Sequence, residues 1–144
     1  MVKPMCLDSL ITTDHTITEG YKVFDTTLGY ITAIMFSGYI LNGTIHDDNN
    51  ERIKIPRCRW LEAIHGTISC LDGIVYPCGF HFYETFKGAH EYAKEVGAPW
   101  RIMKIEVKEI LASGYQCSLE SRTDFNKAHV AKHMFILRSV CSSD

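Results

Sequence analysis

The sequence lacks the short motifs that mark the common enzyme classes. It has no GxSxG nucleophile elbow, no P-loop, no GxGxxG turn and no HExxH zinc motif. It also lacks a run of Lys and Arg, and its formal charge of −2 gives no basic footprint for a phosphate backbone. We therefore expect no cofactor and no strong nucleic-acid binding, and the missing motifs weigh against an enzyme.

Apolar stretches long enough for a membrane span, about 20 residues, are also missing. The N-terminus shows no apolar segment of the kind that signal peptides carry. Six cysteines are present, but no two of them form a CxxC pair. Reduced, mostly buried thiols in a cytoplasmic protein fit these features better than disulfides, because free Cys behaves as a small hydrophobic residue.

The chain length predicts one domain. Its 144 residues, 46% of them hydrophobic, suffice for a core of their own. We expect residues 1–144 to form this single domain. Residues 1–19 carry little charge and several β-favouring residues, which predicts a loose N-terminal arm with one edge strand.

Most of the chain has the pattern of β-strands. Alternating or β-branched residues predict strands at 20–25, 80–83, 100–111 and 130–140. The segments 30–36 and 39–45 are expected to pair as a hairpin that turns at Ser37-Gly38. A second tight hairpin is expected around Asp72-Gly73.

Two helices are predicted beside these strands. Thr85 suits an N-cap and Gly97 a C-terminal stop. Between them, apolar residues recur on one helical face, at Phe86, Ala89, Ala93 and Val96. Pro56 suits the first turn of a short second helix. The predicted fold class is α+β: a mostly antiparallel sheet with one principal helix (about 85–96) and one short helix (about 57–65).

The stretch before the principal helix holds most residues that could do chemistry. On a strand, His81 and Tyr83 share one face while Phe80 and Phe82 take the other. His and Tyr recur in binding and catalytic sites, and Glu84 follows directly. A half-buried strand whose polar atoms are satisfied locally is the structural alternative. The strand is therefore a candidate pocket wall.

Two further patterns bear on chemistry. His129 and His133 have a spacing that suits two metal ligands, but a site needs three or four, and the sequence supplies no others nearby. No metal is expected. Cys78 could be a nucleophile if His81 or His90 lowered its pKa, although a buried, inert thiol is the more common case.

Three blocks together resemble a known family: GYKVF at 20–24, GFHFYETFKGAHEY at 79–92 and VAKHMFILRSV at 130–140. They are similar to a domain of unassigned function found in small proteins that bacteriophages often carry. In this chain Ser139 stands where that family has an acidic residue. The resemblance implies a phage-borne protein acting in the host cytoplasm.

A second resemblance is to ADP-ribosyltransferases, which place a His and a Tyr on core strands around a nicotinamide pocket. It implies that His81 and Tyr83 would line such a pocket, with Glu106 as the distant acid. That family distributes these residues over separate strands, whereas here His81, Tyr83 and Glu84 lie in one.

Three functional hypotheses follow. The first is a non-enzymatic phage or viral accessory protein that binds a small ligand, such as a nucleotide-type signal, or a host protein, and so counters host defence. The second is an ADP-ribosyltransferase-like enzyme, and the third a homo-oligomeric virion component. The candidate ligand-binding residues are Tyr21, Lys22, His81, Tyr83, Glu84 and Glu106.

Overall fold

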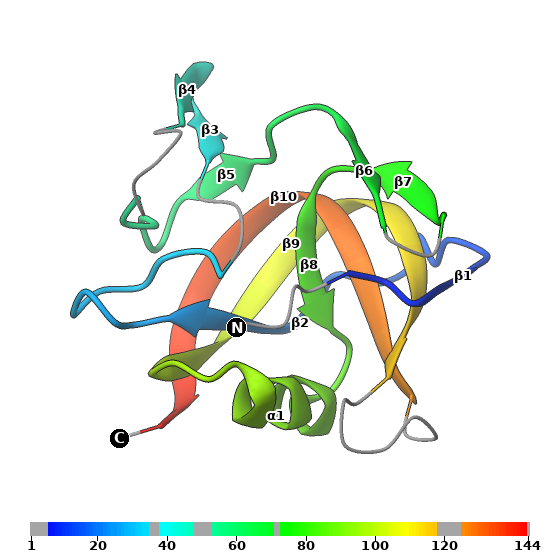
Figure 1. The fold of residues 1–144 in the computed structure, drawn as a ribbon. Coiled ribbons are helices and arrows are strands. Elements are labelled where there is room, and N and C mark those ends of the chain that lie inside the picture. Colours follow the sequence, from blue (N-terminus) through cyan, green and yellow to red (C-terminus); the bar gives the residue numbers. More distant parts are fainter. Residues whose placement is uncertain (1–5, 35–37, 48–52, 71–72, 118–124, 144) are drawn as a thin grey trace.

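The computed structural model describes residues 6–34, 38–47, 53–70, 73–117 and 125–143. The elements in chain order are β1 (Ser9–Ile11), β2 (Glu19–Asp25), β3 (Tyr39–Leu41), β4 (Thr44–His46), β5 (Trp60–Glu62), β6 (Thr67–Ser69), β7 (Val75–Pro77), β8 (Phe80–Tyr83), α1 (Phe86–Glu95), β9 (Trp100–Cys117) and β10 (Phe125–Ser142). Figure 1 shows β9 and β10 as two long curved ribbons around which the shorter strands gather.

Among the described residues, eight strands form one antiparallel sheet in the order β1-β9-β2-β8-β10-β5-β3-β4. β9 also pairs with β10 along nearly their whole length. The pairings β9–β2, β2–β8, β8–β10 and β10–β9 therefore close a ring of four strands. The link between β2 and β8 is short, with Tyr21 opposite Tyr83. We call this short pairing of β2 with β8 the seam. It closes the ring, and the other strands of the sheet extend from the ring.

Irregular positions let the long β9–β10 hairpin bend. The register shifts between Val130 and Ala131, between Ile136 and Arg138, and again near the C-terminus. Glu109 adopts a φ of 57°, in the left-handed region that non-glycine residues rarely occupy. Bulges of this kind increase the local twist of a strand pair. They explain how two 18-residue strands can curve around a core rather than extend flat.

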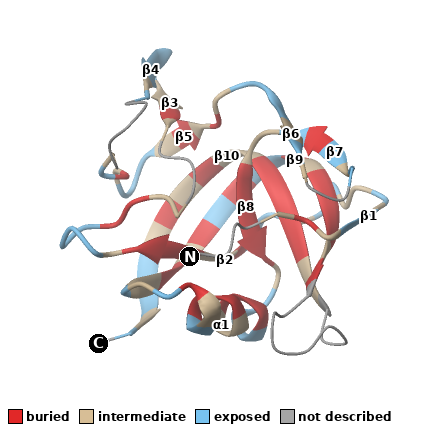
Figure 2. Cartoon of the chain, in the orientation of Figure 1, coloured by how far each residue is buried: buried red, intermediate tan, exposed pale blue. Residues whose placement is uncertain are grey.

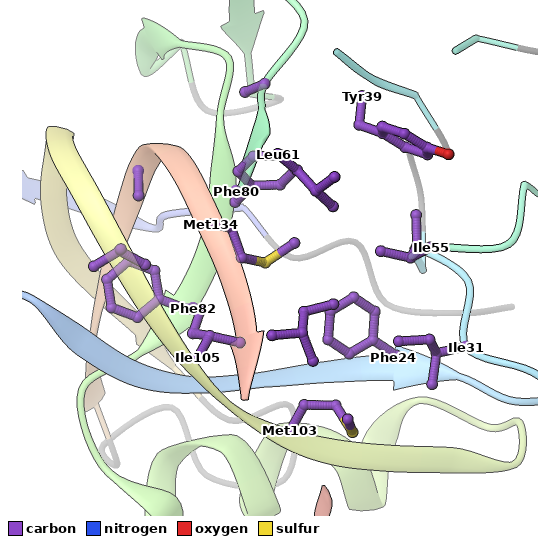
Figure 3. Close-up of a cluster of buried hydrophobic side chains, with 14 of the residues drawn as sticks. Phe24, Ile31, Tyr39, Ile55, Leu61, Phe80, Phe82, Met103, Ile105 and Met134 are labelled. Atoms are coloured by element: carbon purple, nitrogen blue, oxygen red, sulfur yellow. The ribbon is translucent and has the colours of Figure 1, made fainter. Parts of the chain in front are cut away.

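The sheet is packed on both faces, so that it separates two clusters of buried side chains. Figure 3 shows the first core, whose members include Phe24, Ile31, Tyr39, Ile55, Leu61, Phe80, Phe82, Met103, Ile105 and Met134. The second core lies beneath α1, the β6–β7 hairpin and the N-terminal segment, and includes Leu7, Val23, Tyr76, Tyr83, Ala89, Tyr92, Ala93, Val96, Ile102 and Val130. β8 contributes to both cores and is buried over its whole length (Figure 2).

The predicted α+β class is wrong, because the structure is essentially all-β. Strands account for 55% of the described residues and helix for 8%, and α1 is the one helix among them. The segment 57–65, which was predicted to be a helix, contains the strand β5 instead. Cys58 has a φ of 59°, which interrupts a helix at its start. Leu61 is fully buried and pairs with Met134 of β10, so tertiary pairing overrides the helical pattern.

The principal helix was predicted correctly. The Thr85 side chain accepts a hydrogen bond from the Gly88 amide at 3.1 Å, and the chain leaves the helix at Gly97 with a φ of 76°. The tight hairpin around residue 73 is also present, as β6 and β7. The turn of the other predicted hairpin, at Ser37-Gly38, lies partly outside the described residues, because Ser37 is not described. β3 and β4 are joined at Asn42-Gly43, both with positive φ, the preferred pair for such a turn.

The described part of the N-terminal segment is fastened to the sheet. Leu7 is buried in the second core, and the Asp8 amide donates to the Tyr115 carbonyl oxygen at 2.8 Å. β1 then pairs with the far end of β9.

Candidate functional site

β8 places the two leading candidates, His81 and Tyr83, on one face, as the strand period requires. That face is the second core, and the two residues are only 6% and 1% exposed. The Tyr83 hydroxyl donates a hydrogen bond to Gln116 Oε1, and its ring centre lies 5.8 Å from that of Tyr92. His81 Nε2 lies 2.8 Å from the Tyr76 hydroxyl. The polar atoms of the candidate pocket wall are thus engaged inside the protein.

The Tyr76 hydroxyl is the centre of this buried polar group. It accepts the Leu7 amide at 3.0 Å, and the Cys70 thiol lies at 3.8 Å. The hydroxyl can therefore donate its own hydrogen bond to His81 Nε2. Burial, reinforced by the charge of Lys22, lowers the pKa of His81 to about 3. The imidazole is therefore neutral at physiological pH and accepts this hydrogen bond.

The depressed pKa of His81 predicts a loss of stability in acid. In the unfolded chain the ring takes up a proton near pH 6.5, but in the folded protein only near pH 3. The unfolded state binds more protons between these values, so stability is complete above pH 6.5 and falls as the pH drops toward 3. Urea unfolding between pH 7 and pH 4 should show a shallower loss of stability for His81→Gln than for the parent. The variant His15→Gln, which changes an exposed histidine, is the control. Equal slopes for parent and His81→Gln would contradict the assignment.

Lys22 points to the first-core face of β2, opposite its neighbours Tyr21 and Val23. Its Nζ donates to the His81 carbonyl oxygen at 2.6 Å and lies 5.7 Å from the centre of the Phe24 ring. Burial lowers the pKa of this amine to about 7. Lys22 thus links β2 to β8 across the short seam and does not share a surface with Tyr21.

Glu84 belongs to a different polar cluster, at the end of β8. Its Oε1 lies 3.7 Å from His129 Nε2 and 3.9 Å from Lys127 Nζ. On the other side of the ring, His129 Nδ1 lies 2.7 Å from Ser113 Oγ, which also accepts the Asp14 amide at 3.0 Å. The composition resembles a Ser-His-acid triad. However, Ser113 and His129 are both 0% exposed, so no substrate can reach the hydroxyl.

The two histidines considered as metal ligands are kept apart. Their register partners on β9, Ser113 and Lys108, lie on opposite sides of an irregularity at which Leu111 is left without a partner. His129 packs against Phe82 at 5.5 Å between ring centres, whereas His133 lies 3.8 Å from Glu62 and 3.9 Å from Glu109. Across the ranges that the structure describes, no group of three or more His, Cys, Asp or Glu is arranged to hold a metal ion.

The thiol of Cys78 does not have the environment of a nucleophile. Burial raises its pKa, the opposite of what an activated cysteine needs. Glu106 is exposed on β9, where its register partners are Glu19 and Phe135 rather than residues of β8. The structure therefore brings together His81 and Tyr83 but leaves Lys22, Glu84 and Glu106 in three separate surroundings.

Tyr21 leads to a surface feature that the sequence reading did not identify. Its ring meets that of Phe86 edge-on at 6.0 Å, Phe86 stacks on His90 at 5.6 Å, and His90 meets Trp100 at 5.8 Å. We call Tyr21, Phe86, His90 and Trp100 the aromatic row. It runs from β2 along α1 to the start of β9 (Figure 1).

The aromatic row is partly open to solvent. Phe86 is 36% exposed, and the other three residues are of intermediate exposure. Lys104 lies with its Nζ 4.4 Å from the centre of the Tyr21 ring and 3.2 Å from Glu19 Oε1. The sequence does contain a signal for the aromatic row, namely Phe86 and His90, four residues apart on a helix. It was missed because Phe86 was assigned to the buried face.

Comparison with known proteins adds no family: no family model, curated protein or solved structure matches this chain. The resemblance to phage-borne proteins therefore stays a prediction. The described residues contain no helix that is both long and apolar enough to cross a membrane.

Proposed function

We propose that this chain is a non-enzymatic accessory protein of a phage or virus that binds a host protein in the host cytoplasm and so counters host defence. The observation that carries the binding role is the aromatic row, four rings in continuous contact on a partly exposed edge. The phage origin and the compartment rest on the sequence resemblance.

The surroundings of the row support a protein target. Aromatic residues are enriched in protein interfaces, where large rigid rings contribute contact area at little cost in entropy. The outer face of α1 adds charges of both signs, with Lys87 Nζ 3.8 Å from Glu91 Oε1. A hydrophobic centre with a mixed polar rim is the usual anatomy of such an interface.

A nucleotide-type ligand is the other target that we considered, and it makes different demands. A base needs an open ring face to stack on, and its phosphates need an uncommitted cation. In the row, Phe86 and His90 already stack on each other with 17° between their planes, and Lys104 is paired with Glu19. These contacts favour the protein target.

The test compares capture of host proteins by the parent, by Phe86→Ala and by Ile45→Ala. Ile45 is 64% exposed on β4. Ile45→Ala is the matched control because this substitution removes apolar surface far from α1 (Figure 1). We expect Phe86→Ala to reduce the amount of the captured protein about tenfold or more, since central aromatic residues dominate interface energies, and Ile45→Ala to leave it unchanged. A protein captured equally by all three would contradict the proposal. A melting-temperature shift with a nucleotide panel, lost in Phe86→Ala, would instead favour the small ligand.

The enzymatic hypothesis of ADP-ribosyl transfer has less physical support. It needs His81 and Tyr83 beside a substrate, and both are buried with their polar atoms engaged. Incubation with labelled NAD and host extract decides the matter. Label transfer that is lost in His81→Ala and Tyr83→Ala would overturn our proposal.

A homo-oligomeric structural role would use the same exposed row for contacts between copies. Light scattering after size exclusion distinguishes it. An oligomer that Phe86→Ala dissociates would support that role, and a monomer at high concentration leaves the host-protein target.

A further inference from the structure

Two cysteines from distant parts of the chain meet at the edge of the second core. Cys6 lies in the N-terminal segment directly before the buried Leu7, and Cys70 directly follows β6. Both are free and of intermediate exposure. They approach each other because the N-terminal segment and the β6–β7 hairpin cover the same patch of the sheet.

The Tyr76 hydroxyl fixes this meeting point. It accepts the backbone amide of Leu7 at 3.0 Å, which holds Cys6 on one side. The Cys70 thiol approaches the same oxygen to 3.8 Å from the other side. Burial, reinforced by the neighbouring Cys70 thiol, raises the pKa of Cys6 to about 11.

The backbone on both sides of the pair is anchored. The Cys70 amide donates to the Ile74 carbonyl oxygen at 2.9 Å within the hairpin. The Asp8 amide donates to the Tyr115 carbonyl oxygen at 2.8 Å. The two cysteines therefore lie close to one hydroxyl on two anchored segments, and proximity of the two backbones is what a disulfide requires.

We propose that Cys6 and Cys70 form a dithiol site that a peroxide oxidises to a disulfide, which fastens the N-terminal segment to the β6–β7 hairpin. One thiolate attacks a peroxide oxygen, the O–O bond breaks, and the products are a sulfenic acid and water. The second thiol then attacks that sulfur and releases a second water. Overall two thiols and one H₂O₂ give one disulfide and two waters, with sulfur oxidised and oxygen reduced.

Two properties of the reaction follow from the surroundings. The thiolate is the reactive form, and the pKa of Cys6 is raised, so attack by Cys6 is slow at pH 7 and accelerates toward pH 9. The bond would close the long loop from residue 6 to residue 70. A constraint of that length is expected to raise the melting temperature by about 10 °C.

The experiment treats the parent protein with H₂O₂ at pH 8.5, alkylates the remaining thiols and digests it without reduction. We expect mass spectrometry to show a cross-linked peptide pair containing Cys6 and Cys70, and a melting temperature that rises on oxidation and returns with dithiothreitol. Cys6→Ser and Cys70→Ser should each abolish the rise. Cys78→Ser, which removes another partly exposed thiol, should retain it.

Two results would overturn the inference. One is a disulfide that joins other cysteines in the parent. The other is an oxidised parent with Cys6 and Cys70 both alkylated after prolonged treatment. Because two separate serine variants are compared, a folding defect in one leaves the other to decide. The outcome is independent of whether the aromatic row binds a host protein.

Discussion

Gly20→Ala is expected to destabilise the protein by about 3 kcal/mol, because there is no room for a side chain where β2 meets β8. A Cβ at this position would lie 2.4 Å from Phe82 Cδ2 and 2.6 Å from the Tyr83 carbonyl oxygen. The Phe82 ring is fully buried and the carbonyl is backbone, so neither can move aside cheaply. The added methyl group would force apart the short seam that closes the ring of four strands.

The matched control for this prediction is Gly29→Ala. Gly29 has a φ of 85°, and a Cβ there would meet nothing within 4 Å. Its substitution carries only the strain of the left-handed backbone, about 1 kcal/mol. Urea unfolding monitored by circular dichroism measures both, and the midpoint of Gly20→Ala should fall further at unchanged slope. A Gly20→Ala midpoint at or above that of Gly29→Ala would show that the strands do not approach so closely.

Tyr76→Phe is expected to cost a similar amount, about 3 kcal/mol, although it removes a single oxygen atom. The hydroxyl accepts the Leu7 amide at 3.0 Å and lies 2.8 Å from His81 Nε2. Both partners are buried, and each would lose its hydrogen bond without gaining one from water. The loss should also release the N-terminal segment, which this hydroxyl holds to the second core.

Tyr30→Phe is the control for the loss of a tyrosine hydroxyl as such. Tyr30 is 37% exposed, so water can solvate its surroundings and its substitution should change stability by less than about 0.5 kcal/mol. Hydrogen exchange adds a local measure. In Tyr76→Phe the amide of Leu7 should exchange much faster than in the parent, whereas a Leu7 amide that stays protected would contradict the assigned role of the hydroxyl.

The elements predicted correctly are those whose local pattern and tertiary environment agree. α1 has its cap at Thr85 and its stop at Gly97, and both act as predicted. β9 shows the expected alternation, with Met103, Ile105 and Val107 buried in the first core. In a strand such as β9 the side-chain period alone predicts which residues are buried.

The errors arose where long-range pairing decides. Trp60–Glu62 lies in a segment with helix-like apolar spacing, but its backbone pairs with β10 and so forms a strand. A spacing of four reveals neither the irregularity at Leu111 of β9 nor the different surroundings of His129, which packs on Phe82, and His133, which lies beside Glu62. A bulge depends on the partner strand, and a single strand's sequence contains no sign of it.

The candidate site was only partly predictable for a related reason. Alternation places His81 and Tyr83 on one face, which is correct, but it gives no information on what covers that face. Here α1, the β6–β7 hairpin and the N-terminal segment cover it, and a second core forms. The aromatic row depends on contacts between β2, α1 and β9, which only the folded chain brings together.

The central claim is that binding occurs at the aromatic row and not at the His81 strand. The chain has two tryptophans, Trp60 and Trp100, and the second belongs to the row. A Trp60→Phe variant therefore leaves one fluorescent reporter at the proposed interface. The host protein captured by the parent is titrated into this variant, with and without the additional Phe86→Ala change.

The account predicts a saturable shift of Trp100 emission, with a dissociation constant about tenfold or more weaker once Phe86 is replaced, since an aromatic residue at the centre of an interface contributes more than 1 kcal/mol. Binding that calorimetry detects with full strength in both proteins, while Trp100 emission stays constant, would contradict it.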